Sequence, residues 1–134
     1  MKRTLLIIAV ALSAAAFVSA QSMYSEDLLK RAGFDEAQIK KATTMQTKAA
    51  EAQKVDQVDL NLFRAQLEKE LLATDPDMAK VEKLLRGSAD QRVKMEMGQI
   101  RLRVELRKLA GEDRWTRLVQ ALQARRDQRT RKGK

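Results

Sequence analysis

The sequence predicts an all-α fold, an elongated antiparallel hairpin of two long helices with a short helix at each end, four helices per protomer. Three observations support this. The composition is rich in Ala, Leu, Lys, Arg, Glu and Gln, which lose little entropy in a helix, and the 134 residues include one Pro and five Gly. Helix-capping signals recur along the chain, and apolar residues between them recur at helical spacing.

The first twenty residues have the pattern of a secretory signal peptide. Lys2 and Arg3 precede an apolar run over residues 5–18, and small residues stand before a cleavage point after Ala20. The run has 14 residues, fewer than the roughly 20 that span a bilayer. We therefore expect a cleaved signal peptide, residues 1–20, and a periplasmic mature chain with a net charge of +7, because the two cations are lost from a total of +9.

The clearest helix start is a capping box with a hydrophobic staple. Asp35 takes the N-cap, and the side chain of Gln38 at N3 reaches back to the N-cap backbone. Phe34, just before the cap, packs on Ile39 one turn into the helix. These four residues are the helix-cap motif, and a helix without Pro or Gly should follow over residues 36–73.

Further signals set the neighbouring boundaries. A short helix, capped by Ser25 and ended by Gly33, should precede the helix-cap motif. Asp75 as N-cap and Pro76 as first helical residue should open the second long helix, which runs to about Leu109. The helical domain as a whole is expected to cover residues 21–124.

Two features of the C-terminal half are less regular. The Gly87-Ser88 pair either ends the second long helix or lies within a continuous, bent one, and we favour the continuous helix. A last helix is expected over residues 112–126, with Trp115 anchored in the core. The basic tail, residues 125–134, is expected to be disordered.

Residues 93–109 carry two apolar faces. Alternation of apolar and charged residues over 100–106 would suit a strand, but the chain offers no partner strand, so a helix covered on both sides fits better. We expect the leucine face inside the protomer and the other face outward, against a second protomer or a bound chain. The inward face comprises Met95, Leu102, Leu106 and Leu109, and the outward face Val93, Met97, Ile100 and Val104.

Two basic flanks separate the two faces: Lys94, Arg101 and Lys108 on one side, and Arg92, Arg103 and Arg107 on the other. They are either solvated edges whose stems cover apolar surface, or the walls of a positively charged, partly apolar groove for segments with both acidic and apolar residues. The candidate client-binding or dimer face combines the outward face with residues of both flanks: Val93, Met97, Ile100, Arg101, Arg103, Val104, Arg107 and Lys108.

The absence of Cys and His from the sequence narrows the function classes. It removes the commonest transition-metal ligands, the usual general base and the reactive thiol. Met95 and Met97 point to different sides of a helix and should not converge on one ion. We expect no enzymatic activity, no cofactor and no bound metal. Export argues against nucleic acid as partner, and the basic tail should give at most weak electrostatic association with membranes.

At two helix starts the chain resembles the Spy/CpxP-like family of periplasmic helical proteins, whose motif is LTxxQ. Residues 34–38, Phe-Asp-Glu-Ala-Gln, match it with Phe for Leu and Asp for Thr. Residues 109–113, Leu-Ala-Gly-Glu-Asp, stand at the second position, where Ala110 and Asp113 depart from Thr and Gln.

The resemblance implies a cradle-shaped homodimer that binds unfolded or misfolded envelope proteins without ATP, as part of an envelope stress response. Related members of this heavy-metal-resistance family imply the alternatives, a metal-sensing or metal-resistance protein or an adaptor of an envelope-stress sensor.

Overall fold

The computed structural model describes residues 23–133, which form helices and no strand. The predicted all-α class with two long helices is confirmed, and the dimer stays a prediction. The predicted signal peptide lies outside the described residues. Within the described part, no helix is both long and apolar enough to cross a membrane. The helices are α1 (Glu26–Arg31), α2 (Glu36–Leu71), α3 (Met78–Ala110) and α4 (Glu112–Lys132).

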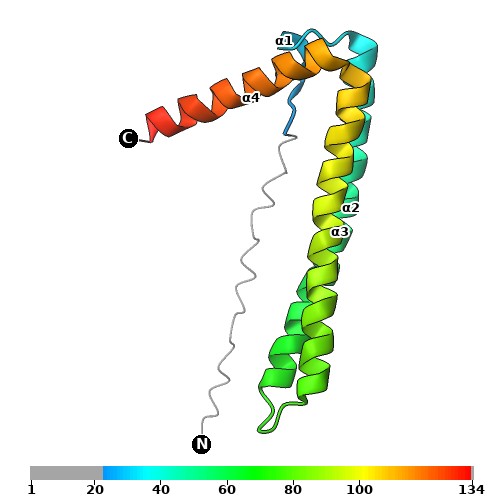
Figure 1. The fold of residues 1–134 in the computed structure, drawn as a ribbon, viewed down its shortest axis with the longest axis vertical. Coiled ribbons are helices and arrows are strands. Elements are labelled where there is room, and N and C mark those ends of the chain that lie inside the picture. Colours follow the sequence, from blue (N-terminus) through cyan, green and yellow to red (C-terminus); the bar gives the residue numbers. More distant parts are fainter. Residues whose placement is uncertain (1–22, 134) are drawn as a thin grey trace, which may run out of the picture.

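The molecule has the outline of a letter L. α2 and α3 lie side by side as an antiparallel hairpin, with α1 and α4 at the end away from its turn (Figure 1). The 36 residues of α2 extend over about 54 Å at 1.5 Å per residue. α4 leaves the hairpin sideways, and its C-terminal part extends away from the other helices (Figure 1).

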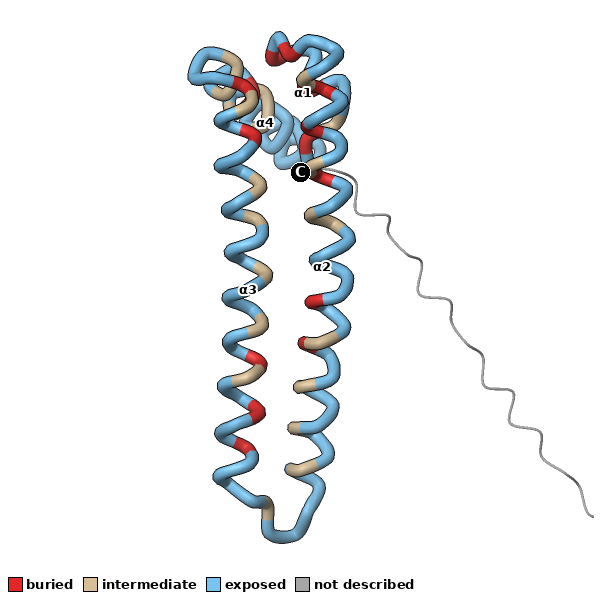
Figure 2. The backbone as a smooth tube through the Cα atoms, turned by 90° about the vertical axis from the view of Figure 1, so that its right-hand side faces the viewer, coloured by how far each residue is buried: buried red, intermediate tan, exposed pale blue. Residues whose placement is uncertain are grey.

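The main core lies where all four helices meet, which is where buried positions cluster in Figure 2. Trp115 packs against this cluster with its ring centroid 6.4 Å from that of Tyr24, so its predicted role as an anchor is confirmed. Further along the hairpin, only α2 and α3 face each other. The buried cluster comprises Tyr24, Leu28, Leu29, Ala32, Phe34, Ile39, Ala42, Leu106, Ala110 and Leu118.

α3 is continuous through Gly87 and Ser88, as expected. The ring of Phe63 on α2 occupies the space that a Cβ at residue 87 would take. Ser88, one residue on, is buried in the same interface. Gly87 therefore serves the close approach of the two helices rather than ending one of them.

The predicted start of α3 is wrong by two residues. Asp77, not Asp75, is the N-cap, and its Oδ1 accepts hydrogen bonds from the backbone N–H groups of Ala79 at 3.0 Å and Lys80 at 3.3 Å. Pro76 lies in the turn before the helix. Glu70 explains the choice, because its carboxylate accepts from the Asp77 N–H at 3.1 Å and pairs with Lys80 at 2.7 Å.

Of the other predicted helix boundaries, the glycine positions agree with the structure and the end of α4 does not. Gly33, with φ of +89°, follows α1 as predicted, and Gly111, with φ of +77°, separates α3 from α4. α4 continues to Lys132, so its predicted end near Arg126 is wrong, and residues 125–132 are helical rather than disordered. This segment contains neither Gly nor Pro and is rich in Arg, which favours helix.

Candidate functional site

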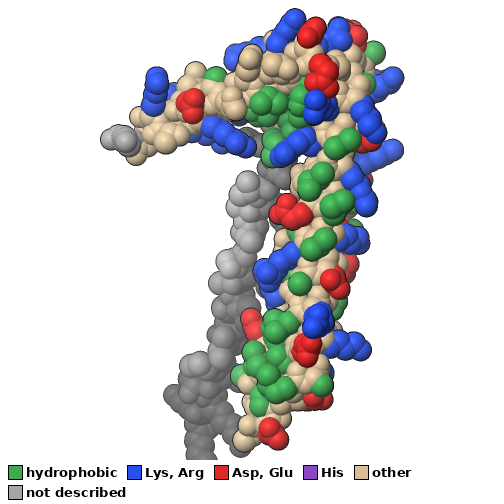
Figure 3. Space-filling model, viewed as in Figure 1, with side chains coloured by type: hydrophobic (Ala, Val, Ile, Leu, Met, Phe, Trp, Pro, Cys, Tyr) green, Lys and Arg blue, Asp and Glu red, His purple; other side chains and the backbone are tan. Residues whose placement is uncertain are grey.

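The outward face of α3 is an apolar stripe on the side away from α2. It comprises four residues at helical spacing, with exposed fractions of 61% at Val93, 41% at Met97, 48% at Ile100 and 44% at Val104. In Figure 3, hydrophobic side chains are spaced along the visible face of α3 between Lys and Arg side chains. We call these four residues the α3 stripe.

The opposite face of α3 points into the protomer. Leu106 is fully buried, and Leu102 and Leu109 pack against the core as partly buried residues. Met95 is half-buried at the α2 side. The predicted inward and outward faces are therefore as the structure has them, although what covers the α3 stripe in solution stays a prediction.

The basic flanks divide into paired and unpaired cations. Arg107 contacts the carboxylate of Glu112 through two hydrogen bonds of 2.9 and 2.8 Å, and this guanidinium lowers the pKa of Glu112 below its ordinary value. Lys108 pairs with Glu105 at 3.1 Å. Arg101 and Arg103 are exposed and form no ion pair within residues 23–133. Of the six predicted flanking cations, Lys94, Arg107 and Lys108 are paired, and Arg92, Arg101 and Arg103 form no ion pair within the described residues.

The helix-cap motif forms as predicted. Asp35 Oδ1 accepts a hydrogen bond from the Gln38 backbone N–H at 2.8 Å, and Gln38 Oε1 accepts one from the Asp35 N–H at 3.1 Å. Phe34 and Ile39 are buried in the same core cluster. The Gln38 amide also donates to the backbone carbonyl of Leu109 at 3.2 Å, a contact that sequence reasoning missed.

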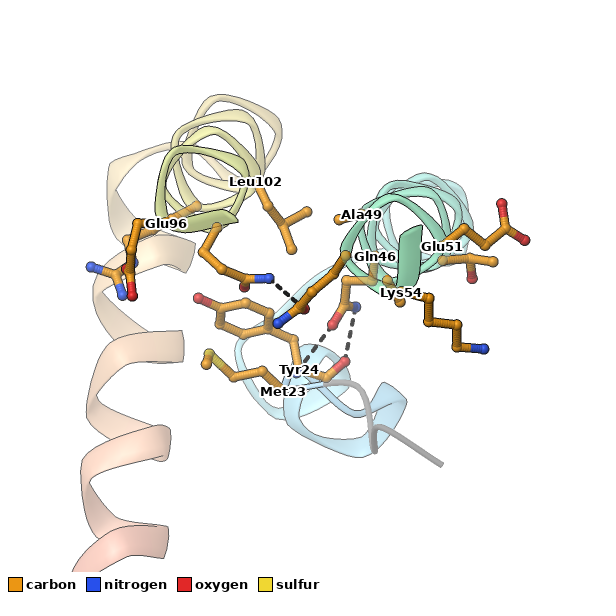
Figure 4. Close-up of a pocket in the computed structure, with 13 residues that line it drawn as sticks. Met23, Tyr24, Gln46, Ala49, Glu51, Lys54, Glu96 and Leu102 are labelled. Atoms are coloured by element: carbon orange, nitrogen blue, oxygen red, sulfur yellow. Dashed lines mark hydrogen bonds between the residues drawn. The ribbon is translucent and has the colours of Figure 1, made fainter. Parts of the chain in front are cut away.

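A pocket at the corner of the L, with a volume of about 660 Å³, was also missed (Figure 4). Gln46 forms its wall through two hydrogen bonds to the main chain of Tyr24, accepting from the N–H at 3.2 Å and donating to the carbonyl at 3.1 Å. Gln99 of α3 donates to Gln53 of α2 at 2.9 Å. Glutamines at core-facing positions of α2 were the available signal, since buried amides require partners. Arg103, a predicted flank residue, also lines this pocket.

One ion pair links the long helices near mid-hairpin. Lys94 Nζ lies 2.8 Å from Asp56 Oδ1, and the Gln91 amide donates to the Asp56 carbonyl at 3.1 Å. Asp56 is buried, and its hydrogen bond to the ammonium of Lys94 lowers its pKa. Because neither helix can slide without breaking these contacts, they hold the register of the hairpin.

No family model, curated protein or solved structure matches this chain. The resemblance to the Spy/CpxP-like family therefore remains a prediction drawn from residues 34–38 and 109–113.

The described residues contain no group of three or more His, Cys, Asp or Glu side chains placed to hold a metal ion. The α3 stripe offers aliphatic contact, and Arg101 and Arg103 offer charge-assisted hydrogen bonds to carboxylates. Together they form an open surface suited to extended chains of mixed apolar and acidic character.

Proposed function

We propose that this protein is a periplasmic, ATP-independent chaperone that binds unfolded or misfolded envelope proteins. The observation that carries the proposal is the α3 stripe, four large apolar side chains left exposed on a helix whose other face forms the core. Exposed apolar surface of this kind is typical of interaction sites. Export by the predicted signal peptide would bring this surface to envelope clients.

The geometry of the stripe favours loose binding of many sequences. It lies along the exposed side of α3, and its four residues line neither the corner pocket nor the shallow hollow on α2 beside Ala37 and Met45. Burial of apolar area contributes about 25 cal/mol per Å², whatever the client sequence, so affinity would follow client hydrophobicity. Arg101 and Arg103 would speed capture of acidic segments, and that effect should weaken with salt.

The direct experiment measures light scattering by a denatured client protein with increasing amounts of this protein and no nucleotide. We expect suppression of aggregation at near-stoichiometric ratios. Unchanged scattering over a wide range of ratios would contradict the proposal.

Matched variants locate the binding surface. Val93→Glu with Val104→Glu places two charges on the α3 stripe, and Val55→Glu with Val58→Glu places two on exposed valines of α2. The first pair should abolish suppression and the second should retain it. Equal activity of both variants would remove the α3 stripe from the proposal.

The proposed homodimer is tested on the same samples. A second copy of the chain is the other occupant that suits an apolar stripe, as the family resemblance implies. Sedimentation velocity of the Val93→Glu, Val104→Glu variant separates the two cases. A dimer that persists while suppression is lost assigns the stripe to clients, and conversion to monomers assigns it to the dimer.

A further inference from the structure

The last eight residues of α4 form a basic, exposed helical arm. Residues 125–132, which we call the α4 arm, contain five Arg or Lys residues against a single acidic one, Asp127. Every residue of the arm is exposed. Its place at the end of the projecting helix keeps it away from the hairpin (Figure 1).

The cations of the α4 arm form no ion pair within the described residues. All six ion pairs of the described residues lie between residues 26 and 112. Arg114, at the base of α4, donates to the Gly33 carbonyl at 2.9 Å and so belongs to the core end. None of the arm's cations has such a contact within residues 23–133, so their counter-charges must come from outside the protomer.

Along one side of α4, the side chains change from apolar near the core to basic in the α4 arm. Leu118 and Leu122 face the core on this side, and Arg125, Arg129 and Lys132 follow along it at the same four-and-three spacing. The two-turn arm is about 12 Å long, comparable to the Debye length of about 10 Å at 0.1 M salt. Because the arm is about as long as the Debye length, all of its cations can interact with the same charged surface at once.

We propose that the α4 arm binds the surface of bilayers that contain anionic phospholipid. Planar guanidinium groups match phosphate oxygens with paired hydrogen bonds. The arm contains no large apolar residue that could insert between acyl chains, so it would lie at the headgroups and detach at high salt. Duplex nucleic acid presents the same phosphate chemistry, and the predicted export favours the lipid.

The test is co-sedimentation of the mature chain, which begins at Gln21 after removal of the predicted signal peptide, with vesicles of equal parts phosphatidylglycerol and phosphatidylcholine. The arm variant combines Arg125→Gln, Arg129→Gln and Lys132→Gln. The control combines Lys40→Gln, Lys41→Gln and Lys48→Gln, three exposed cations of α2 that form no ion pair in the described part, and it has the same net charge.

The arm variant should bind about a hundredfold more weakly than the wild type, since each cation near an anionic surface contributes about a factor of five. The control should bind like the wild type. Vesicles of phosphatidylcholine alone should bind neither the control nor the wild type. Equal binding of arm variant and control would overturn the proposal, as would displacement of the protein from vesicles by duplex DNA at lower phosphate concentration than the lipid. Aggregation suppression depends on the α3 stripe, so the vesicle result and the chaperone result fail independently.

Discussion

The side-chain amide of Gln38 donates a hydrogen bond to the backbone carbonyl of Leu109 at 3.2 Å, across 71 residues of sequence. The same side chain completes the capping box with Asp35. One residue thus closes the start of α2 and holds the end of α3 beside it. A local sequence motif and a tertiary contact are carried by a single amide.

Gln38→Ala should destabilise the protein by about 1–2 kcal/mol, because it removes a capping interaction and leaves a partly buried carbonyl unpaired. Urea unfolding followed by circular dichroism measures this. Gln57→Ala is the control, since it removes only an exposed hydrogen bond to Asn61 and should change stability by less than about 0.5 kcal/mol. Equal stability of the two variants would contradict the role given to Gln38.

Two glycines of α3 should respond to alanine with opposite signs. Gly87→Ala forces a methyl group against the Phe63 ring and should cost about 1–3 kcal/mol. Gly98 has nothing within 4 Å of a built Cβ, so Gly98→Ala should gain up to about 1 kcal/mol from helix propensity. Thermal unfolding of both variants decides this, and a stabilising Gly87→Ala would show that the helices do not approach closely there.

The ion pair between Asp56 and Lys94 makes stability depend on acid. Hydrogen bonding to Lys94 lowers the pKa of Asp56 in the folded protein below its unfolded value of about 3.9. Its contribution to stability is therefore complete above about pH 4 and is lost as the pH falls through the folded pKa. Glu70, whose pKa Lys80 lowers, contributes in the same direction.

The midpoint of urea unfolding should consequently fall less for Asp56→Asn than for the wild type between neutral pH and about pH 2. Asp59→Asn is a change of the same kind at a partly exposed aspartate of α2 that forms no ion pair within the described residues, and this variant should follow the wild type. An identical acid response of Asp56→Asn and wild type would assign the acid sensitivity to other carboxylates.

The two faces of α3 should differ in their response to truncation. Leu106→Ala removes a fully buried side chain and should cost about 2–5 kcal/mol. Ile100→Ala changes a half-exposed position and should cost less than about 1 kcal/mol in the protomer. Ile100→Glu should keep the helical content measured by circular dichroism while impairing client binding or dimerisation. Unfolding by Ile100→Glu would mean that this face is buried in the native protein.

The predicted signal peptide is tested by mass. The protein recovered from the periplasm of a producing cell should begin at Gln21, and intact-mass measurement reads this directly. A full-length mass in the membrane fraction would instead indicate a retained anchor, and the proposed periplasmic chaperone would lose its stated compartment.

Most of the fold could be predicted from local sequence signals. The capping box at Asp35, the glycine after α1 and the spacing of apolar residues each depend on neighbours within two helical turns, so the sequence alone suffices for them. The orientation of α3 was predictable because leucines mark one face. The start of α3 was not, because the choice between Asp75 and Asp77 depends on Glu70 from the end of the preceding helix.

The remaining misses have physical causes of the same kind. The role of Gly87 depends on Phe63 of the other helix, and the corner pocket depends on Gln46 meeting the main chain of Tyr24. Such contacts join residues that no local window contains. The high charge of residues 125–132 predicts disorder, whereas their helix propensity is good, and the structure follows the propensity.

The uneven distribution of the core along the hairpin has a consequence for folding. The six-residue connection between Leu71 and Met78 makes the turn end the least costly place to bring α2 and α3 together. The buried cluster that repays this cost lies at the opposite end and needs all four helices. Closure should thus begin at the turn, while native amide exchange is slowest near Leu29, Leu106 and Leu118, giving a protein that starts folding where it is weakest.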